Sequence, residues 1–267
     1  MASTRPPAVA GLFYPSEARD LQREVARLLA AASTPARAPL PKALLVPHAG
    51  YVYSGPVAAS GYARIAPLHG RIERVVLLGP AHRVAVRGLA LPSVDAFATP
   101  LGAVRLDRPS MQALAGWPQV CVSDRAHAEE HSLEVHLPFL QALLEDFSLV
   151  PFAVGDATEW EVAAVLERLW GGDETLVVVS SDLSHYLPYT GARAMDEATA
   201  RRILRLEPGL DHDQACGAAP INGLLVTAQS RRLGCELIDL RNSGDTAGDC
   251  SRVVGYGAFG FYESGRR

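Results

Sequence analysis

Three separate segments of the chain place a histidine within four residues of the end of a short apolar run. The runs read KALLVP, RVVLLG and TLVVVSS, and the residues that follow them are His48, His82, and Asp182 with His185. Such runs are typical of strands that are buried on both faces of a sheet. In open α/β sheets, the loops that leave the carboxyl ends of parallel strands gather at one edge, where ligands bind. We therefore expect one shared site at this edge, although a single histidine after a strand is more often structural or solvated.

A second group of polar residues lies in the segment AHAEEHSLEVHLPF, residues 126–139. One interpretation is a solvated, charged entry to a helix that begins near Pro138. The other places one histidine and one glutamate in the shared site, where they transfer protons or orient other groups. Its last two histidines are five residues apart, so the segment lacks the spacing of a zincin helix. The residues alone leave both interpretations open for His127, Glu129, Glu130, His131, Glu134 and His136.

Cys216 lies in the string ACGAAPI, which indicates a tight turn before a helix. A thiol near a helix N-terminus has its thiolate form favoured by the helix dipole, which suits a nucleophile or a metal ligand. The alternative is a small buried apolar residue, the commoner role of a free cysteine. Cys121 and Cys235 lie in strand-like runs and are expected in the core, whereas Cys250 lies in a loop and is expected to be exposed and inert.

The remaining patterns predict a three-layer α/β fold, with a mixed, mostly parallel sheet flanked by helices. Apolar residues recur at helical spacing between the strands, and Thr158 with Glu161 forms a capping box before one such helix. No shift in composition marks a boundary, which predicts a single domain over residues 1–267. Further strands are expected at 148–154, 235–240 and 253–262, and helices at 17–32, after Thr158, at 193–205 and at 221–232.

The string GYGAFG at 255–260 matches the fingerprint of a dinucleotide-binding loop. That chemistry needs a strand before the glycines and a helix N-terminus after them, to hold the pyrophosphate. Here the glycines lie inside a strand pattern, so we expect no dinucleotide site but a strand packed closely against another backbone.

Composition excludes several functional classes. Of the 267 residues, 48% are hydrophobic and the net charge is −4, so the chain can bury a core and has no basic tract for nucleic acid or an anionic membrane. No apolar run approaches the ~20 residues that span a bilayer, and residues 1–7 do not resemble a signal peptide. Four scattered cysteines indicate reduced thiols, hence a cytoplasmic location. Arginine replaces lysine everywhere except at Lys42, which is typical of a GC-rich bacterial genome.

Several motifs together resemble the Memo family, whose bacterial members are protein B of the AmmeMemoRadiSam system. The resemblance covers nearly the whole chain, and two of its motifs are long enough to be distinctive. In chain order the motifs are AGLFYP, PHAGYVYSG, GPAHR, EEHSLEVHLPF, SSDLSHY and CGAAPI.

The resemblance implies a fold similar to that of class III extradiol dioxygenases, which use non-haem iron. It implies a metal site of two histidines and one cysteine, which correspond to His48, His82 and Cys216. It also implies a functional association with radical-SAM and AMMECR-like proteins. In the turn after the cysteine this chain has Gly217, Ala218 and Ala219, where some relatives carry Arg and His, which changes the side chains available to steer a ligand. The residues expected to act beside the metal, in proton transfer, are His131, Asp182 and His185.

Two imidazoles and one thiolate leave coordination positions open, which suits Fe(II) and also Cu or Zn(II). We expect Fe(II) and a redox enzyme that acts on a small molecule. Dioxygenase activity does not follow from the resemblance alone, because the dioxygenases have a carboxylate in place of the thiolate, and thiolate is the softer ligand. The alternatives are a metal-binding interaction protein, whose crevice holds a peptide or a partner protein, and a zinc hydrolase. We expect the ligand atoms of the metal site to converge, with His131 facing the site and His136 outside it.

Overall fold

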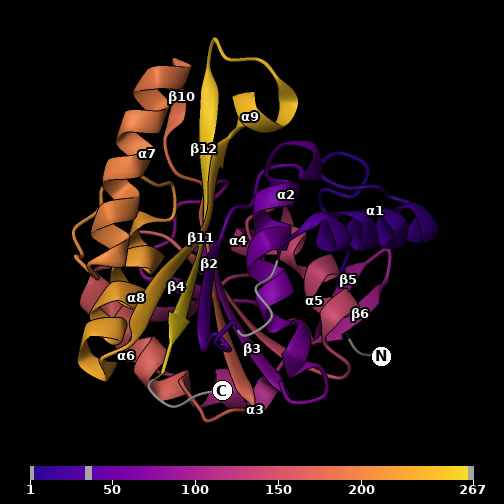
Figure 1. The fold of residues 1–267 in the computed structure, drawn as a ribbon. Coiled ribbons are helices and arrows are strands. Elements are labelled where there is room, and N and C mark those ends of the chain that lie inside the picture. Colours follow the sequence, from indigo (N-terminus) through magenta and orange to yellow (C-terminus); the bar gives the residue numbers. More distant parts are fainter. Residues whose placement is uncertain (1–2, 34–37, 264–267) are drawn as a thin grey trace.

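The computed structural model describes residues 3–33 and 38–263 of the chain. The expectation about a signal peptide concerned residues 1–7, of which Met1 and Ala2 lie outside the described residues. Within the described part, one nine-stranded sheet lies between two layers of helices, and a three-stranded sheet lies beside it (Figure 1).

The centre of the large sheet consists of four neighbouring parallel strands. Nearly every residue in them is buried, because both faces are covered by helices, and this explains their continuous apolar sequences. All four were expected from the sequence, and their bounds agree with the expected ranges to within a residue. In spatial order they are β2 (Ala43–Val46), β9 (Thr175–Ser180), β3 (Arg74–Pro80) and β8 (Ser148–Val154).

Antiparallel pairs extend the sheet on both sides of this centre. The strand β12 pairs with β2, and it also pairs with β10 and β11. On the other side β4 is antiparallel to β8, and β7 is parallel to β4. The mixed sheet that the sequence predicts is therefore present. These strands are β10 (His185–Leu187), β11 (Gly234–Asn242), β12 (Val253–Tyr262), β4 (Leu89–Leu91) and β7 (Val120–Val122).

The string GYGAFG forms part of β12 and precedes no helix, as expected. Its glycines approach side chains rather than the backbone that we expected. A Cβ atom on Gly255 would lie 2.1 Å from a carboxylate oxygen of Asp196, so only glycine leaves room for this buried side chain.

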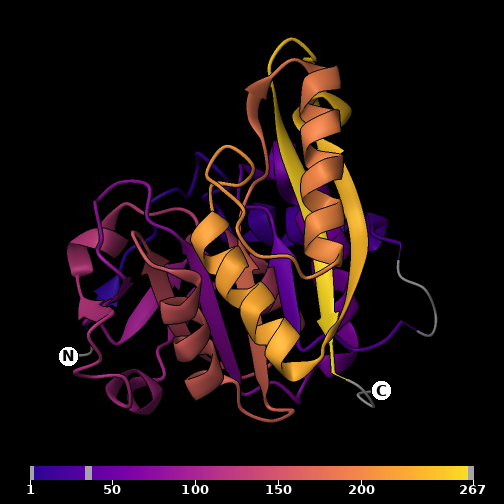
Figure 2. The same ribbon diagram turned by 90° about the vertical axis from the view of Figure 1, so that its left-hand side faces the viewer.

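Helices cover both faces of the sheet (Figures 1 and 2). One layer contains α1 (Ala18–Ala31), α2 (Tyr51–Tyr62) and α5 (Leu137–Leu143). The other layer faces the viewer in Figure 2 and contains α6 (Glu159–Leu169), α7 (Tyr189–Leu204) and α8 (Ala218–Arg231). The capping box of Thr158 and Glu161 is formed at the start of α6. Among the described residues, no helix has both the length and the apolar character needed to cross a membrane.

Shorter elements connect this frame. The small sheet has the order β1 (Thr4–Arg5), β5 (Ala96–Thr99) and β6 (Gly102–Arg105). Short helices are α3 (Arg108–Gln112), α4 (Asp124–Ala128) and α9 (Ser243–Ala247), with 3-10 turns η1 (Ala63–Leu68) and η2 (Glu134–His136).

Two cysteines differ from their expected positions. Cys121 is exposed on β7, so its placement in the core was wrong, because β7 is the last strand of the sheet. Cys235 is partly buried, and Cys250 is exposed as expected.

Candidate metal centre

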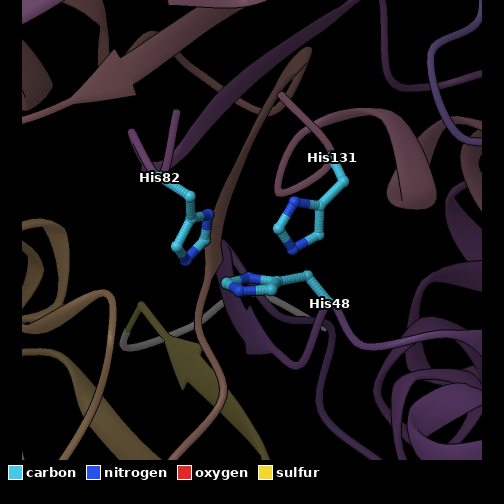
Figure 3. A group of neighbouring side chains, drawn as sticks. All are labelled: His48, His82 and His131. Carbon is cyan, nitrogen blue, oxygen red and sulfur yellow. The ribbon is translucent and has the colours of Figure 1, made fainter. Parts of the chain in front are cut away.

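Three histidines meet at one point of the structure. His48, His82 and His131 each present a ring nitrogen, and these nitrogens all lie within 4.8 Å of one another. Figure 3 shows the three rings around a common space, each reaching it from a different segment of the chain. Imidazole is a common ligand of transition metals, so three converging rings form a candidate metal site.

The fold brings these residues together through neighbouring parallel strands. His48 follows β2 and His82 follows β3, while β9 lies between these two strands and leads into Asp182. The carboxyl ends of the three strands therefore meet at one edge, as the sequence predicts. His131 comes from the loop between α4 and η2, which is not attached to a strand of this group.

The hydrogen bonds of His48 define its tautomer. The hydroxyl of Ser180 donates to the carbonyl oxygen of Ser132 at 2.6 Å, so it can only accept at Nδ1 of His48, which lies 2.6 Å away. Nδ1 therefore carries the proton, and Nε2 presents its lone pair to the common space. Burial, followed by the nearby imidazoles, lowers the pKa of His48 well below its usual value, so the ring is neutral.

Glu130 holds His82 from behind. Its carboxylate accepts the backbone N–H of His82 at 2.6 Å and lies 2.9 Å from Nδ1 of the same residue. Burial raises the pKa of Glu130, but the hydrogen bonds from His82 and from the backbone of Ser132 outweigh this and lower it to about 2. Because an ionised carboxylate only accepts, Nδ1 of His82 carries a proton, and Nε2 is the ring nitrogen turned away from Glu130 that a metal would use.

The ring of His131 stacks on that of His82 and packs at a tilt against that of Phe13. Its ring centroid lies 4.7 Å from that of His82 and 4.7 Å from that of Phe13. Its Nδ1 is buried, 3.3 Å from a carboxylate oxygen of Glu130, but the geometry does not form a hydrogen bond. Burial lowers the pKa of His131 to about 4, so this imidazole is also neutral at pH 7. Its expected position facing the site is therefore observed.

Cys216 touches the group at His48. Its sulfur lies 3.4 Å from Nε2 of His48. The group whose ligand atoms all lie within 4.8 Å of one another consists of the three histidines and does not include Cys216. Burial, then the nearby Asp182, raises the pKa of the thiol to about 12, which opposes the effect of the helix dipole. A Cβ atom on Gly217 would lie 2.7 Å from the carbonyl oxygen of Ser180, so this glycine allows the turn to reach the end of β9.

Asp182 and His185 lie in the same cleft as the cluster. Asp182 accepts the backbone N–H of His48 at 2.8 Å and thereby fixes the turn after β2. Burial raises its pKa to about 7, although the backbone N–H groups of His48 and Ala49 oppose the shift. Burial also lowers the pKa of His185, and a hydrogen bond with the backbone of Leu183 opposes this.

The cluster lies in a cleft of about 1020 Å³. Aromatic and apolar side chains line the cleft together with the polar groups, among them Phe13, Tyr53 and Tyr256. A volume of this size, with a few convergent polar groups, is typical of a binding site for a small molecule.

The segment 126–139 is buried, so its interpretation as a solvated helix entry was wrong for most of its polar residues. Glu134 is fully buried and accepts hydrogen bonds from Arg5, Tyr14 and the backbone of Ala8 and Val9. These bonds fix the N-terminal loop that carries Phe13. His136 is buried beside Tyr62, bonds to the backbone of Ser132 and does not line the cleft, as expected.

Comparison with known proteins places the chain in a family. The family described as "Memo-like protein" matches residues 5–259. The chain belongs to the Memo-like family. A MEMO1 family protein of Aquifex aeolicus is 38% identical over 267 aligned residues, covering 94% of this chain and 97% of that protein. A MEMO1 family protein of Methanosarcina barkeri is 37% identical, covering 95% of this chain and 98% of that protein.

A solved structure shares the fold of this Memo-like chain. The crystal structure of the uncharacterized protein JW3007 from Escherichia coli K12 matches with a TM-score of 0.50 and 15% identity, over 80% of this chain and 98% of that chain. At that identity the likeness concerns the fold alone. The expected α/β fold, a mixed sheet flanked by helices, is confirmed.

The donor atoms of this Memo-like site fit a first-row transition metal. Ser180 and Glu130 engage the Nδ1 atoms of His48 and His82, so Nε2 is the atom with which each ring would bind a metal. Imidazole and thiolate ligands suit Fe, Cu and Zn, whereas Mg²⁺ and Ca²⁺ prefer oxygen. The sequence left open whether a glutamate of the segment 126–139 orients a residue of the site, which Glu130 does for His82, and it assigned no role to Ser180. The adjacent acid in EEHS and the serine that ends TLVVVS were the available signals.

Proposed function

We propose that this chain binds Fe(II) through His48, His82 and Cys216 and is a non-haem oxidoreductase that acts on a small molecule. One observation carries the proposal, namely the 3.4 Å between Nε2 of His48 and Sγ of Cys216 beside the free nitrogen of His82. Two ligands on one tetrahedral ion, at about 2.0 Å for nitrogen and about 2.3 Å for sulfur, lie about 3.5 Å apart. The pair is therefore spaced as two ligands of one ion would be.

Iron in its reduced form, bound with open coordination positions, would supply the redox chemistry. Cu and Zn(II) suit the same donors, and Zn(II) would direct the site toward hydrolysis instead. The thiol of Cys216 has to lose its proton when it becomes a ligand, so metal uptake releases a proton.

The other residues of the site act on what is bound there. His131 lies with its ring 5.3 Å from that of His48, on the side of Phe13, and we assign it the transfer of a proton at the bound ligand. Asp182 holds the turn that carries His48, while its carboxyl group is available for proton exchange. His185 lines the cleft and is the second candidate for proton transfer.

A second candidate function is a metal-binding protein whose cleft receives a peptide or a partner from the AmmeMemoRadiSam system. The exposed apolar side chains near the cleft favour it. Val52 is 66% exposed and Tyr53 is 46% exposed at the start of α2, and Tyr53 lines the cleft. Exposed apolar groups at the entrance of a site are typical of a surface that binds another molecule.

Metal analysis of variants tests the ligand set. The protein is purified without oxygen, loaded with Fe(II) or Zn(II), and its bound metal is counted. We expect Cys216→Ser and His82→Gln to lose most of the affinity, with His131→Gln retaining the metal. Cys235→Ser is the matched control, because this thiol is partly buried and does not line the cleft.

A different pattern would identify the alternative ligand set. If His131→Gln abolishes metal binding and Cys216→Ser does not, the ion is held by the three histidines that lie within 4.8 Å, and the proposed role of the thiolate is wrong. If none of the variants changes metal content, the cleft is not a metal site.

A further inference from the structure

The cleft contains a guanidinium group that lies over an aromatic ring. The Cζ atom of Arg252 lies 5.3 Å from the ring centroid of Tyr186, and both residues line the cleft that holds the histidine cluster. A cation–π contact of this kind uses the charge of the guanidinium group and not its N–H donors. Among the described residues no hydrogen bond engages these N–H groups, so they can bind an anion.

An irregularity in the backbone places the ring there. Strand β10 pairs with β12 through His185 with Val254 and Leu187 with Val253, and the register shifts between these two pairs. Tyr186 is the extra residue of this bulge. Its φ is 58°, a backbone conformation that is unfavourable for residues other than glycine.

The bulge has a direct consequence for the cleft. In a regular strand, neighbouring side chains point to opposite faces, but His185, Tyr186 and Leu187 all line the cleft. Bulges near binding sites commonly direct a side chain in this way, and the strain persists only where the surrounding structure imposes it.

Arg252 has no acidic partner among residues 3–33 and 38–263, where no carboxylate lies within 4.0 Å of its guanidinium group. Asp249 also lines the cleft, but its carboxylate accepts hydrogen bonds from the backbone and hydroxyl of Ser251, at 2.9 and 2.8 Å. Within the described part of the chain, Arg252 is the one arginine or lysine that lines the cleft. A guanidinium group with free donors and no carboxylate partner is suited to a carboxylate or phosphate group of a ligand.

We propose that Arg252, which lies over the ring of Tyr186, binds an anionic group of the ligand, while the opposite end of the same ligand binds the metal. This inference rests on the proposed metal site. A cleft of about 1020 Å³ lies at the upper end of the range for small-molecule sites, so it accepts a ligand long enough to have two separate binding groups. The ligand class is an anionic molecule with a metal-binding group at its other end.

The test uses Zn(II)-loaded protein and hydroxamic acids, which bind metal ions through two oxygen atoms. One series has neutral alkyl tails of increasing length. Two matched series end in a carboxylate or in a phosphonate. Dissociation constants are measured by isothermal titration calorimetry for the wild type, Arg252→Gln, Arg252→Lys and Arg83→Gln. Arg83 is the control for loss of positive charge near the site, because its charge lowers the pKa of His131 but it does not line the cleft.

We expect an anionic tail of one or more lengths to bind the wild type about tenfold more tightly than its neutral counterpart, the lower range for a charge-assisted hydrogen bond. Arg252→Gln should abolish this preference, Arg252→Lys should keep part of it, and Arg83→Gln should keep it fully. The carboxylate and phosphonate series show which anion is preferred.

Two failures are distinguishable. If the neutral hydroxamates bind only to metal-loaded protein but no anionic tail is preferred, or the preference survives in Arg252→Gln, the inference about Arg252 is wrong and the metal site stands. If the wild type takes up no metal, or the neutral series does not bind to the loaded protein, the proposed function itself fails and this inference fails with it.

Discussion

We expect Glu130→Gln to weaken metal binding although Glu130 is not a proposed ligand. Its carboxylate accepts two bonds from His82, at 2.6 Å from the backbone and 2.9 Å from Nδ1, and one each from the backbone of His131 and Ser132, both at 2.9 Å. Glutamine keeps the shape, but one of its terminal atoms is an NH₂ group that can only donate. Whichever way the amide turns, at least one buried N–H loses its acceptor, which costs about 1–3 kcal/mol of stability.

The loss of negative charge behind His82 also affects the metal. A hydrogen-bonded carboxylate fixes the ring and raises the basicity of its free nitrogen, and removing such a partner typically reduces metal affinity about 10- to 100-fold. That range corresponds to about 1.4–2.7 kcal/mol of binding free energy. Competition with a chromophoric chelator for Zn(II) measures the affinity, and urea unfolding of the metal-free protein measures the stability.

Glu134→Gln is the matched control. Glu134 lies in the same segment, is equally buried and also accepts four hydrogen bonds, but none of them comes from a histidine of the site. Glu134→Gln should therefore lower the stability and leave the Zn(II) affinity within about twofold of the wild type. Equal losses of affinity in both variants would refute the reasoning, since the effect would then follow from general destabilisation.

Two further predictions concern stability. Gly217→Ala should destabilise the protein by about 1–3 kcal/mol, because the new Cβ atom would lie 2.7 Å from the carbonyl oxygen of Ser180, and it should weaken metal binding by displacing Cys216. Urea unfolding measures the stability and Zn(II) competition measures the affinity. Gly191→Ala is the control, because a Cβ atom at that position meets nothing within 4 Å. His127 is buried, and burial lowers its pKa from 6.5 to about 4, so the unfolded state takes up the proton first as the pH falls below 6.5. The wild type should lose about 2–3 kcal/mol more stability than His127→Gln between pH 7.5 and 4.5, measured by urea unfolding at both pH values, and equal losses would contradict this.

The central strands could be predicted because burial on both faces leaves a strong local signal. The runs that became β2, β3, β8 and β9 are continuously apolar and end in polar turns, and the loops after three of them do meet. The helix α2 left no such signal. Its sequence YVYSGPVAASGY contains glycines and a proline, and it is helical because it packs between the sheet and the helices α1 and α5.

The division of roles within the site could not be read from spacing. His48 and His82 follow strands, so their convergence follows from topology, whereas His131 reaches them from a loop whose path depends on tertiary contacts. The pKa of Cys216 shows the same limit. Its place before a helix favours the thiolate, but burial, which the sequence does not reveal, raises the pKa to about 12.

The segment EEHS explains how these independent parts are joined. The hydroxyl of Ser132 donates to the carbonyl oxygen of Pro80 at 2.8 Å, and the carbonyl oxygen of Ser132 accepts from the hydroxyl of Ser180 at 2.6 Å. Ser132 therefore bonds to the ends of both β3 and β9. Ser180 in turn accepts from His48. A chain of hydrogen bonds therefore runs from the EEHS segment through β9 to His48, while Glu130 of the same segment holds His82. Since buried networks of this kind fix the positions of all their members, a single short segment sets the orientation of both histidines relative to each other.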